Sequence, residues 1–129
     1  MLKEITGESL PIGPLTVFSH YPDEFENLKS ILVSMGQVTH QNNGPFVRLD
    51  QPIKVGDQKI VNLRVRMPDP YRMQVGCNDF IVNDYVKYKG GVLHTFSQNV
   101  RLFDRPDFEM IEFYHPDYDV LAYVLGERK

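Results

Sequence analysis

The sequence predicts an α+β fold made of two similar halves, each running strand, helix and then about three strands. Three observations lead to this prediction. One amphipathic pattern at helical spacing covers residues 22–36, the segments after it alternate polar and apolar residues at a period of two, and the same order of elements returns after residue 72. The strands are therefore expected to form mainly antiparallel sheets beside two helices.

Composition bounds the class of protein. The 129 residues are 42% hydrophobic and 24% charged, enough for one sizeable core, so we expect a single domain over residues 1–129. No apolar run approaches the roughly 18 to 20 residues of a membrane helix, and the first ten residues lack the apolar core of a secretory signal. The lone Cys77 cannot form an internal disulfide. We therefore expect a cytoplasmic protein without a membrane partner.

The charge of the chain argues against a nucleic-acid partner. A net charge of -3 and a pI near 5.7 give no basic footprint for a phosphate backbone. The nearest thing to a basic cluster is Arg64, Arg66 and Arg72. Asp69 and Asp79 lie among these arginines and are expected to offset them, so phosphate binding is not predicted.

The first half contains the clearest helix. Residues 1–14 hold two glycines and two prolines, which predicts a lead-in segment, and residues 15–21 are typical of a strand. The helix should begin at a cap formed by Asp23, with Glu26 completing a capping box. It should end at Gly36 in the left-handed conformation, which makes it the longest helix of the chain, over residues 23–35.

Three strands are predicted after this helix, at residues 45–49, 51–55 and 59–67, with Pro52 separating the first two. The last should stop near Met67, because Pro68 cannot donate a hydrogen bond to a ladder. Residues 68–72 then form a connector between the halves.

The second half repeats this order more weakly. Residues 73–82 predict a strand, and residues 83–91 predict a helix of two turns at most, capped by Asp84. Three further strands are predicted at residues 92–103, 107–115 and 119–127, with a type I turn at residues 116–117.

Two stretches resemble the vicinal oxygen chelate superfamily, the fold of glyoxalases and extradiol dioxygenases. They are 17-VFSHYPDEFENLKSILVSMG-36, where a strand leads into a helix, and 110-MIEFYHPDYDVLAYVL-125, which is similar to the closing hairpin of that fold. The resemblance implies two βαβββ-like modules, residues 15–67 and 73–127, whose sheets curl into a cupped surface around a ligand or a metal.

The sequence does not contain the metal ligands that the resemblance would imply. In metal-dependent members, ligands stand on the first and last strands of each module. Here the first-strand positions fall near residues 15–18 and 76–79, where only Asp79 offers a hard ligand. The last-strand positions fall at Asn62, Arg64 or Arg66 in the first module and near Ala122 or Tyr123 in the second, and none of these is a good ligand. We therefore expect neither a metal nor another cofactor.

Polar residues elsewhere supply the remaining candidates, and no catalytic residue is assigned. The four histidines are scattered without metal-ligand spacing. His115 and Asp117 are expected to form a turn in which the aspartate accepts backbone N–H groups, and Cys77 is expected to be inert because Asp79 beside it disfavours a thiolate. The candidate ligand-binding residues are Asp79, His94, Glu109, Glu112 and His115.

Three functions stay open at this point. The first is a module of this architecture that binds a small organic ligand or a partner without a metal. The second is a metal-dependent enzyme of the glyoxalase or dioxygenase kind, with a metal held by some of these candidates and His20. The third is a structural domain that self-associates through exposed strand edges, and a homodimer would suit either of the other two as well.

Overall fold

The computed structural model of the chain describes residues 1–128. The elements are α1 Leu2–Thr6, β1 Ile12–Phe18, α2 Pro22–Val33, β2 Gly36–His40, β3 Phe46–Val55, β4 Gln58–Arg66, β5 Gly76–Phe80, α3 Tyr85–Thr95, β6 Val100–Asp104, β7 Phe108–Phe113 and β8 Val120–Arg128. None of the helices described is long and apolar enough to cross a membrane.

All eight strands belong to one mixed sheet in the order β2-β3-β4-β1-β5-β8-β7-β6. Within each module the first and last strands, β1 with β4 and β5 with β8, are parallel, and the other neighbouring strands are antiparallel. The predicted α+β class, with two βαβββ modules and mainly antiparallel pairing, is confirmed. The two modules share a single sheet because β1 pairs directly with β5.

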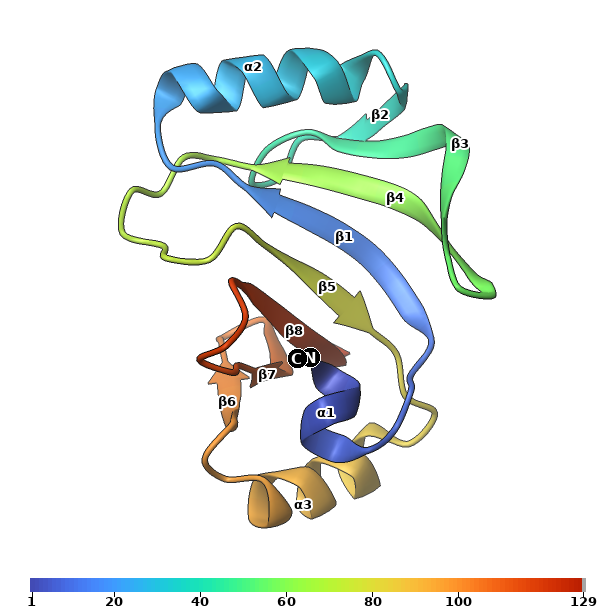
Figure 1. Ribbon diagram of the computed structural model, residues 1–129, viewed down its shortest axis with the longest axis vertical. Helices are drawn as coiled ribbons and strands as arrows, with labels where there is room; N and C mark the ends of the chain where they lie inside the picture. Colours follow the sequence, from blue (N-terminus) through green and yellow to red (C-terminus); the bar gives the residue numbers. More distant parts are fainter. Residues whose placement is uncertain (129) are drawn as a thin grey trace.

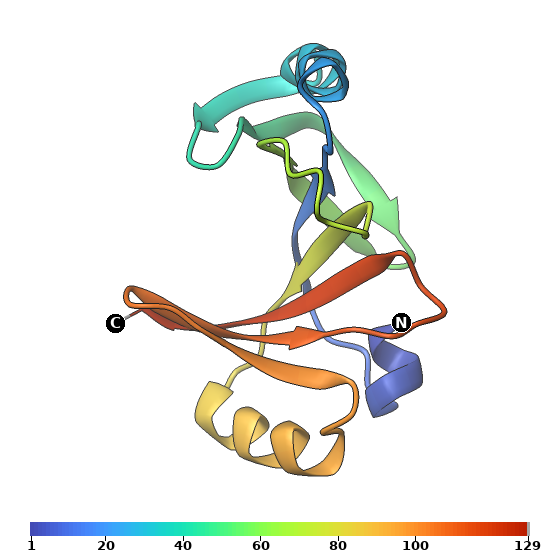
Figure 2. The same cartoon turned by 90° about the vertical axis from the view of Figure 1, so that its left-hand side faces the viewer.

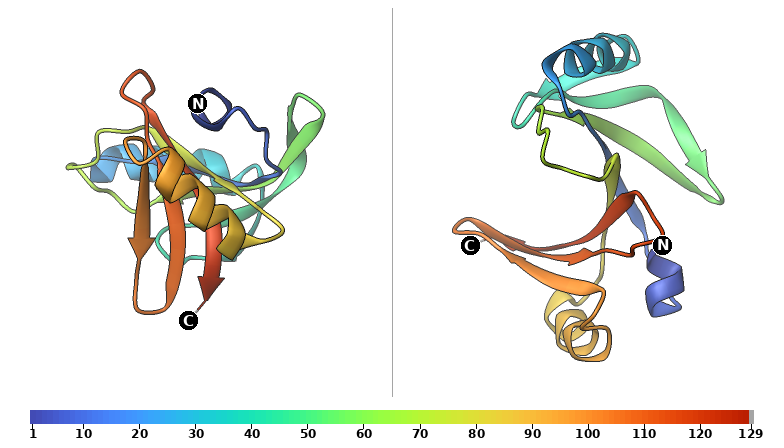
Figure 3. Two further views of the ribbon diagram at one scale, coloured as in Figure 1. Left: turned by 90° about the horizontal axis from the view of Figure 1, so that it is seen from below. Right: turned by 60° about the vertical axis from the view of Figure 1, so that its left-hand side comes forward.

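The sheet curls without closing, and its two long helices lie on the outside. Figure 1 shows α2 beside the strands of the first module and α3 beside those of the second. After a quarter turn, Figure 2 shows these helices at opposite ends of the molecule with the strands between them, and the right-hand view of Figure 3 agrees. One face of the sheet therefore carries the helices, and the other is turned inward.

Alternation along the strands divides the apolar residues between these two faces. Under α2, Phe25 and Leu32 pack on strand residues that include Val47 and Val65. Under α3 and α1, Val92 and Leu2 pack on residues that include Phe113. Burying a side chain of this size stabilises the fold by about 1.5–3 kcal/mol each, so these two clusters hold the helices against the sheet.

A third cluster lies on the opposite side of the strands. Its buried members are Phe18, Cys77, Leu121 and Tyr123, with Met110 packed against them. Each of these residues belongs to a strand of the sheet. Along its strand, each stands next to residues whose side chains face the helices, so its own side chain points to the other side. We call the side of the sheet that carries this cluster the inner face.

The prediction of the longest helix is confirmed, but both of its expected ends are wrong. α2 has 12 residues and α3 has 11. Tyr21 precedes the first helical turn without a side-chain cap, and Pro22 takes the first position, where its fixed backbone angle suits a helix. Gly36 begins β2 instead of ending the helix, and a Cβ there would collide with the carbonyl oxygen of Arg48. This glycine is needed for close approach of two strands.

Three strand predictions need correction. β2 was not predicted as a strand, and it is a short, largely exposed edge strand without an apolar face. β3 runs through Pro52, because the pairing of β3 with β4 shifts register between Arg48 and Ile53 and leaves the proline outside the ladder. Residues 92–95, expected to open a strand, belong to α3.

Two local predictions are confirmed. Asp84 caps α3, its Oδ1 accepting a hydrogen bond from the backbone N–H of Lys87 at 3.2 Å, although the helix is longer than two turns. β4 ends at Arg66, as expected from Pro68. The strand predicted at residues 73–82 is shorter, because β5 begins only at Gly76, so the connector between the modules spans residues 67–75.

Candidate functional site

The inner face is built from two rows of side chains that cross neighbouring strands. In the first row, Arg64 of β4 lies opposite Thr16 of β1, and Thr16 lies opposite Cys77 of β5. In the second, Tyr123 of β8 lies between Asp79 of β5 and Glu112 of β7. The first row crosses the centre of the sheet, where β1 of the first module pairs with β5 of the second, and the second row lies within the second module.

Three arginines stack on aromatic rings at this face. The guanidinium carbons of Arg66 and Arg72 lie 5.1 and 5.6 Å from the centre of the Phe18 ring, and that of Arg64 lies 5.1 Å from the centre of the Phe46 ring. Such contacts use the negative face of the ring and leave the N–H edges of each guanidinium available to an acceptor.

These three arginines have no carboxylate of their own. Among the side chains that the structure describes, none of them forms an ion pair. The buried Nε of Arg64 finds no hydrogen-bond acceptor within the same part of the chain. Burial also lowers the pKa of Arg64, with the charge of Asp79 acting against this shift.

Asp79 and Cys77 titrate abnormally because they are buried. Burial raises the pKa of Asp79 to about 6, partly offset by the charge of Arg64. Burial, and then the charge of Asp79, raises the pKa of Cys77 to about 12. The thiol is therefore neutral near pH 7, and a nucleophilic role for Cys77 gains no support from its surroundings.

Glu112 is the buried centre of a second polar group. Its side chain is 3% exposed, its Oε2 accepts a hydrogen bond from the Tyr123 hydroxyl at 2.7 Å, and its Oε1 accepts one from Arg101 Nη2. Burial, followed by this contact with Glu112, raises the pKa of Tyr123. The network joins β6, β7 and β8 across the inner face.

The five candidates predicted from the sequence lie in different places. Asp79 and Glu112 come together on the inner face, on either side of Tyr123. Glu109 instead faces α3, where its Oε2 accepts hydrogen bonds from Tyr85 and Lys89. His94 is exposed at the end of α3. A role in ligand binding stays a prediction for all of them.

His115, the fifth candidate, lies in the predicted turn between β7 and β8. The backbone N–H of Tyr118 donates to the His115 carbonyl at 3.1 Å, which closes the turn. The expected role of Asp117 as acceptor is wrong, because no backbone N–H of the described residues donates to its carboxylate, whose Oδ2 lies 3.8 Å from Nδ1 of His115. The backbone N–H of Asp117 itself donates to that Nδ1 at 3.1 Å.

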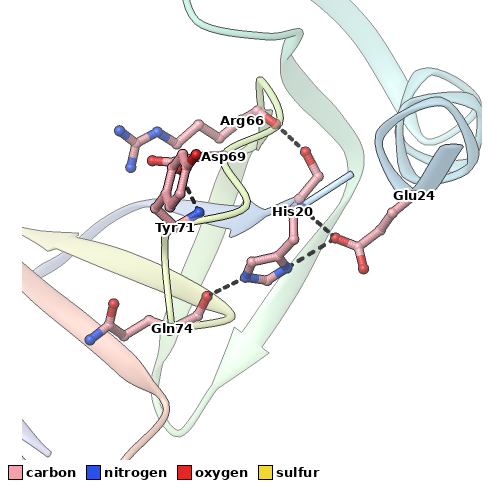
Figure 4. A network of polar contacts seen from close by, with 7 residues as sticks. His20, Glu24, Arg66, Asp69, Tyr71 and Gln74 are labelled. Carbon is pink, nitrogen blue, oxygen red and sulfur yellow. Dashed lines mark hydrogen bonds and ion pairs between the residues drawn. The ribbon is translucent and has the colours of Figure 1, made fainter. Parts of the chain in front are cut away.

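The connector between the modules is tied to the start of α2 (Figure 4). The Nδ1 and Nε2 atoms of His20 lie 3.1 Å from Oε1 of Glu24 and 3.0 Å from the carbonyl oxygen of Gln74. The hydroxyl of Ser19 donates to the carbonyl of Arg66 at 2.7 Å, and the backbone N–H of Asp69 donates to the carbonyl of Ser19 at 3.0 Å. These contacts hold the segment that carries Arg72.

The residues at the positions of the family's metal ligands do not suit a divalent cation. Thr16, Arg64, Cys77 and Tyr123 stand in the two rows, where a guanidinium repels a cation and a protonated thiol is a poor ligand. Within residues 1–128, no group of three or more His, Cys, Asp or Glu side chains could hold a metal ion.

The significance of the arginines was not predicted from the sequence. Asp69 was expected to offset their charge, but Oδ1 of Asp69 accepts a hydrogen bond from the backbone N–H of Tyr71 at 3.0 Å. The alternation of Arg64 and Arg66 with Leu63 and Val65 was a usable signal, since it places both arginines on one face of β4. This pattern does not predict that Arg72, which belongs to the connector, also lies at the inner face.

Two cavities lie beside the short helix α1. One of about 540 Å³ separates the lead-in segment from α3, and the hydroxyl of Tyr88, which lines it, is buried without a partner among the described residues. A second, of about 340 Å³, is lined mainly by residues of β1, β5 and β8, among them Thr16, Cys77 and Leu121. Neither is lined by any of the five predicted site residues.

Comparison with known proteins supports the fold. No protein-family profile matches the sequence, and no curated protein matches it. A solved structure described as "Structural Genomics, Protein EC4020" is similar with a TM-score of 0.75 and 12% identity, over 98% of this chain and 78% of that one. A glyoxalase/bleomycin resistance protein/dioxygenase superfamily member from Vibrio splendidus 12B01 is similar with a TM-score of 0.55 and 11% identity, over 92% of this chain and 100% of that one. The chain thus has a vicinal oxygen chelate-like fold.

Proposed function

We propose that this domain binds a small organic molecule on the inner face of its curled sheet and does so without a metal. The observation that carries the proposal is the set of side chains at the centre of that face. Stacked arginines and a neutral cysteine occupy the positions where metal-dependent proteins of this fold place their ligands.

The chemistry of the inner face suits an organic ligand. Phe46 and Phe103 are half-buried aromatic rings, and Phe103 contacts Tyr123 edge to face at 6.0 Å between ring centres. Ligand sites combine apolar and aromatic surface with a few polar groups that fix orientation. The arginines, Asp79 and Glu112 supply such groups.

A metal-dependent enzyme is the alternative that this arrangement disfavours. Asp79 and Glu112 are the carboxylates nearest to the centre, but Tyr123 stands between them in the sheet. Glu112 already accepts hydrogen bonds from Tyr123 and Arg101. A metal would need to displace those donors and to recruit a third ligand.

Metal analysis and melting separate these two functions. We expect protein purified without added metal to hold less than about one divalent ion per two chains, and a chelator to leave its melting temperature unchanged. A bound small aromatic or dicarbonyl compound at one hundred times its dissociation constant should instead stabilise the fold by about 2.7 kcal/mol.

A defined result would contradict the proposal. Stoichiometric zinc, iron, manganese or nickel, coordinated by at least two of the candidate carboxylates and histidines, would replace the proposal with the enzyme. Those residues are His20, Asp79, His94, Glu109, Glu112 and His115.

A further inference from the structure

We infer that the molecule bound on the inner face carries an oxyanion, a carboxylate or a phosphoryl group, and that Arg66 and Arg72 hold it with Arg64 nearby. This inference rests on the proposed function and specifies the chemical class of its ligand. It starts from two guanidinium groups that stack on the single ring of Phe18.

The local charge of this site is opposite to that of the whole chain. The protein carries a net charge of -3, yet three arginines gather at this face, and Asp79 is the carboxylate whose charge acts on Arg64. Like charges this close repel one another, and the repulsion grows as water is excluded. A bound anion would relieve it.

The arginines are partly withdrawn from water but keep unused donors. Arg64, Arg66 and Arg72 are each half-buried, and the described residues supply no side-chain ion pair to any of them. A guanidinium has five N–H donors in a planar fork that matches a carboxylate or phosphoryl group. The orphaned Nε of Arg64 shows that the protein itself does not satisfy this capacity.

The backbone that carries the arginines is held in place. The carbonyl of Arg66 accepts from the Ser19 hydroxyl, and the connector that presents Arg72 is fixed at Asp69 and Gln74 by Ser19 and His20 (Figure 4). The ring under both guanidiniums belongs to Phe18, which is 3% exposed. A site prepared in this way loses less entropy when it binds.

Matched probes of different charge test the inference. The probes are benzoate, phenyl phosphate and the neutral benzyl alcohol, each measured by thermal shift and by calorimetric titration. We expect both anions to raise the melting temperature and to bind at least about tenfold more tightly than benzyl alcohol, with affinity falling as salt rises. The tighter of the two anions identifies the group that the site prefers.

A charge-matched pair of variants locates the site. R66Q/R72Q should weaken binding of both anions at least about tenfold and leave benzyl alcohol unaffected. K54Q/K59Q removes the same charge from exposed positions on the hairpin of β3 and β4, and it should bind as the wild type does. If the first double variant does not fold, R72Q alone serves, since its side chain comes from the connector.

The outcomes separate the inference from the function on which it rests. Benzyl alcohol binding as tightly as the anions, or anion affinity falling equally in both double variants, would overturn the oxyanion site and leave ligand binding standing. If no probe of either charge binds, both the inference and the proposed function fail for this ligand class.

Discussion

At the scale of single residues, the inner face contains a buried carboxylate that lowers the stability of the fold near neutral pH. Asp79 is a carboxylate without a hydrogen bond from any described residue, placed where burial raises its pKa to about 6 from an ordinary value of 3.8. Between these two values the folded protein holds more protons than the unfolded chain. Stability must therefore fall as pH rises through this window, and the cost is fully present above pH 6.

Replacing Asp79 with Asn tests this directly. We expect D79N to melt at a higher temperature than the wild type at pH 7.5, because an amide avoids the burial of a charge, and the two proteins to converge near pH 4. Melting curves across this range measure the effect, with D107N at an exposed carboxylate as control. A D79N protein less stable than the wild type at pH 7.5 would mean that the attraction between the charges of Asp79 and Arg64 outweighs desolvation.

At the scale of elements, the three outer strands of the second module are joined by polar contacts that do not depend on the backbone ladder. Glu112 links β7 to β8 through Tyr123 and to β6 through Arg101. Arg101 is 70% exposed and can return to water, but Glu112 and the Tyr123 hydroxyl are buried and cannot. The contact between Glu112 and Tyr123 should therefore carry most of the stabilisation.

A double-mutant cycle measures that contact. E112L and Y123F should each lower the free energy of unfolding by about 1–3 kcal/mol, since each leaves a buried polar group without its partner. The double variant should lose less than the sum, by about 1–2 kcal/mol. Urea unfolding provides the measurement, and E26Q at an exposed position of α2 should stay within about 0.5 kcal/mol of the wild type. Simple additivity would show that the two residues act independently.

Individual elements differ in how far sequence predicts them. α2 was predicted because Phe25, Leu28 and Leu32 recur at helical spacing and all lie against the sheet. The end of α3 was misjudged because Val92 and Thr95 favour strands locally, whereas the packing of Val92 against the second core keeps the helix going. β2 has no alternating apolar face to reveal it, and only its pairing with β3 makes it a strand.

The residues of the candidate site also differ in how far the sequence predicts them. Asp79 was identified because it was the hard oxygen donor at the ligand positions that the resemblance implies. Glu112 was named only as one of several polar candidates, and the structure separates it from Glu109, which faces α3. The stacked arginines require two facts that periodicity does not contain. One is the register that sets β4 beside β1, and the other is the path of the connector that returns Arg72 to Phe18.

At the scale of the whole molecule, the two modules are joined by the pairing of β1 with β5 and by the connector at residues 67–75. Tyr71 and Met73 in that connector are 92% and 90% exposed, so its own side chains hardly anchor it. Backbone hydrogen bonds hold its two ends, at Asp69 through Ser19 and at Val75 through Phe18 and Asp119, and His20 adds a side-chain contact to Gln74. The order of this segment, and with it the place of Arg72 at the inner face, should then depend on His20.

Limited proteolysis tests the role of His20, because chymotrypsin can cut after the exposed Tyr71 only when the connector leaves its bound position. We expect H20A to be cleaved there at least about threefold faster than the wild type, since loss of the imidazole removes the contacts with both Glu24 and Gln74. H94A removes an exposed histidine from α3 and should be cleaved at the rate of the wild type. Equal rates in H20A and H94A would show that Ser19 and the paired strands hold the connector without His20. If phenyl phosphate slows the faster cleavage of H20A, the order of the connector is linked to occupation of the inner face. The reason is that a ligand bound to Arg72 stabilises the connector in its bound position by mass action.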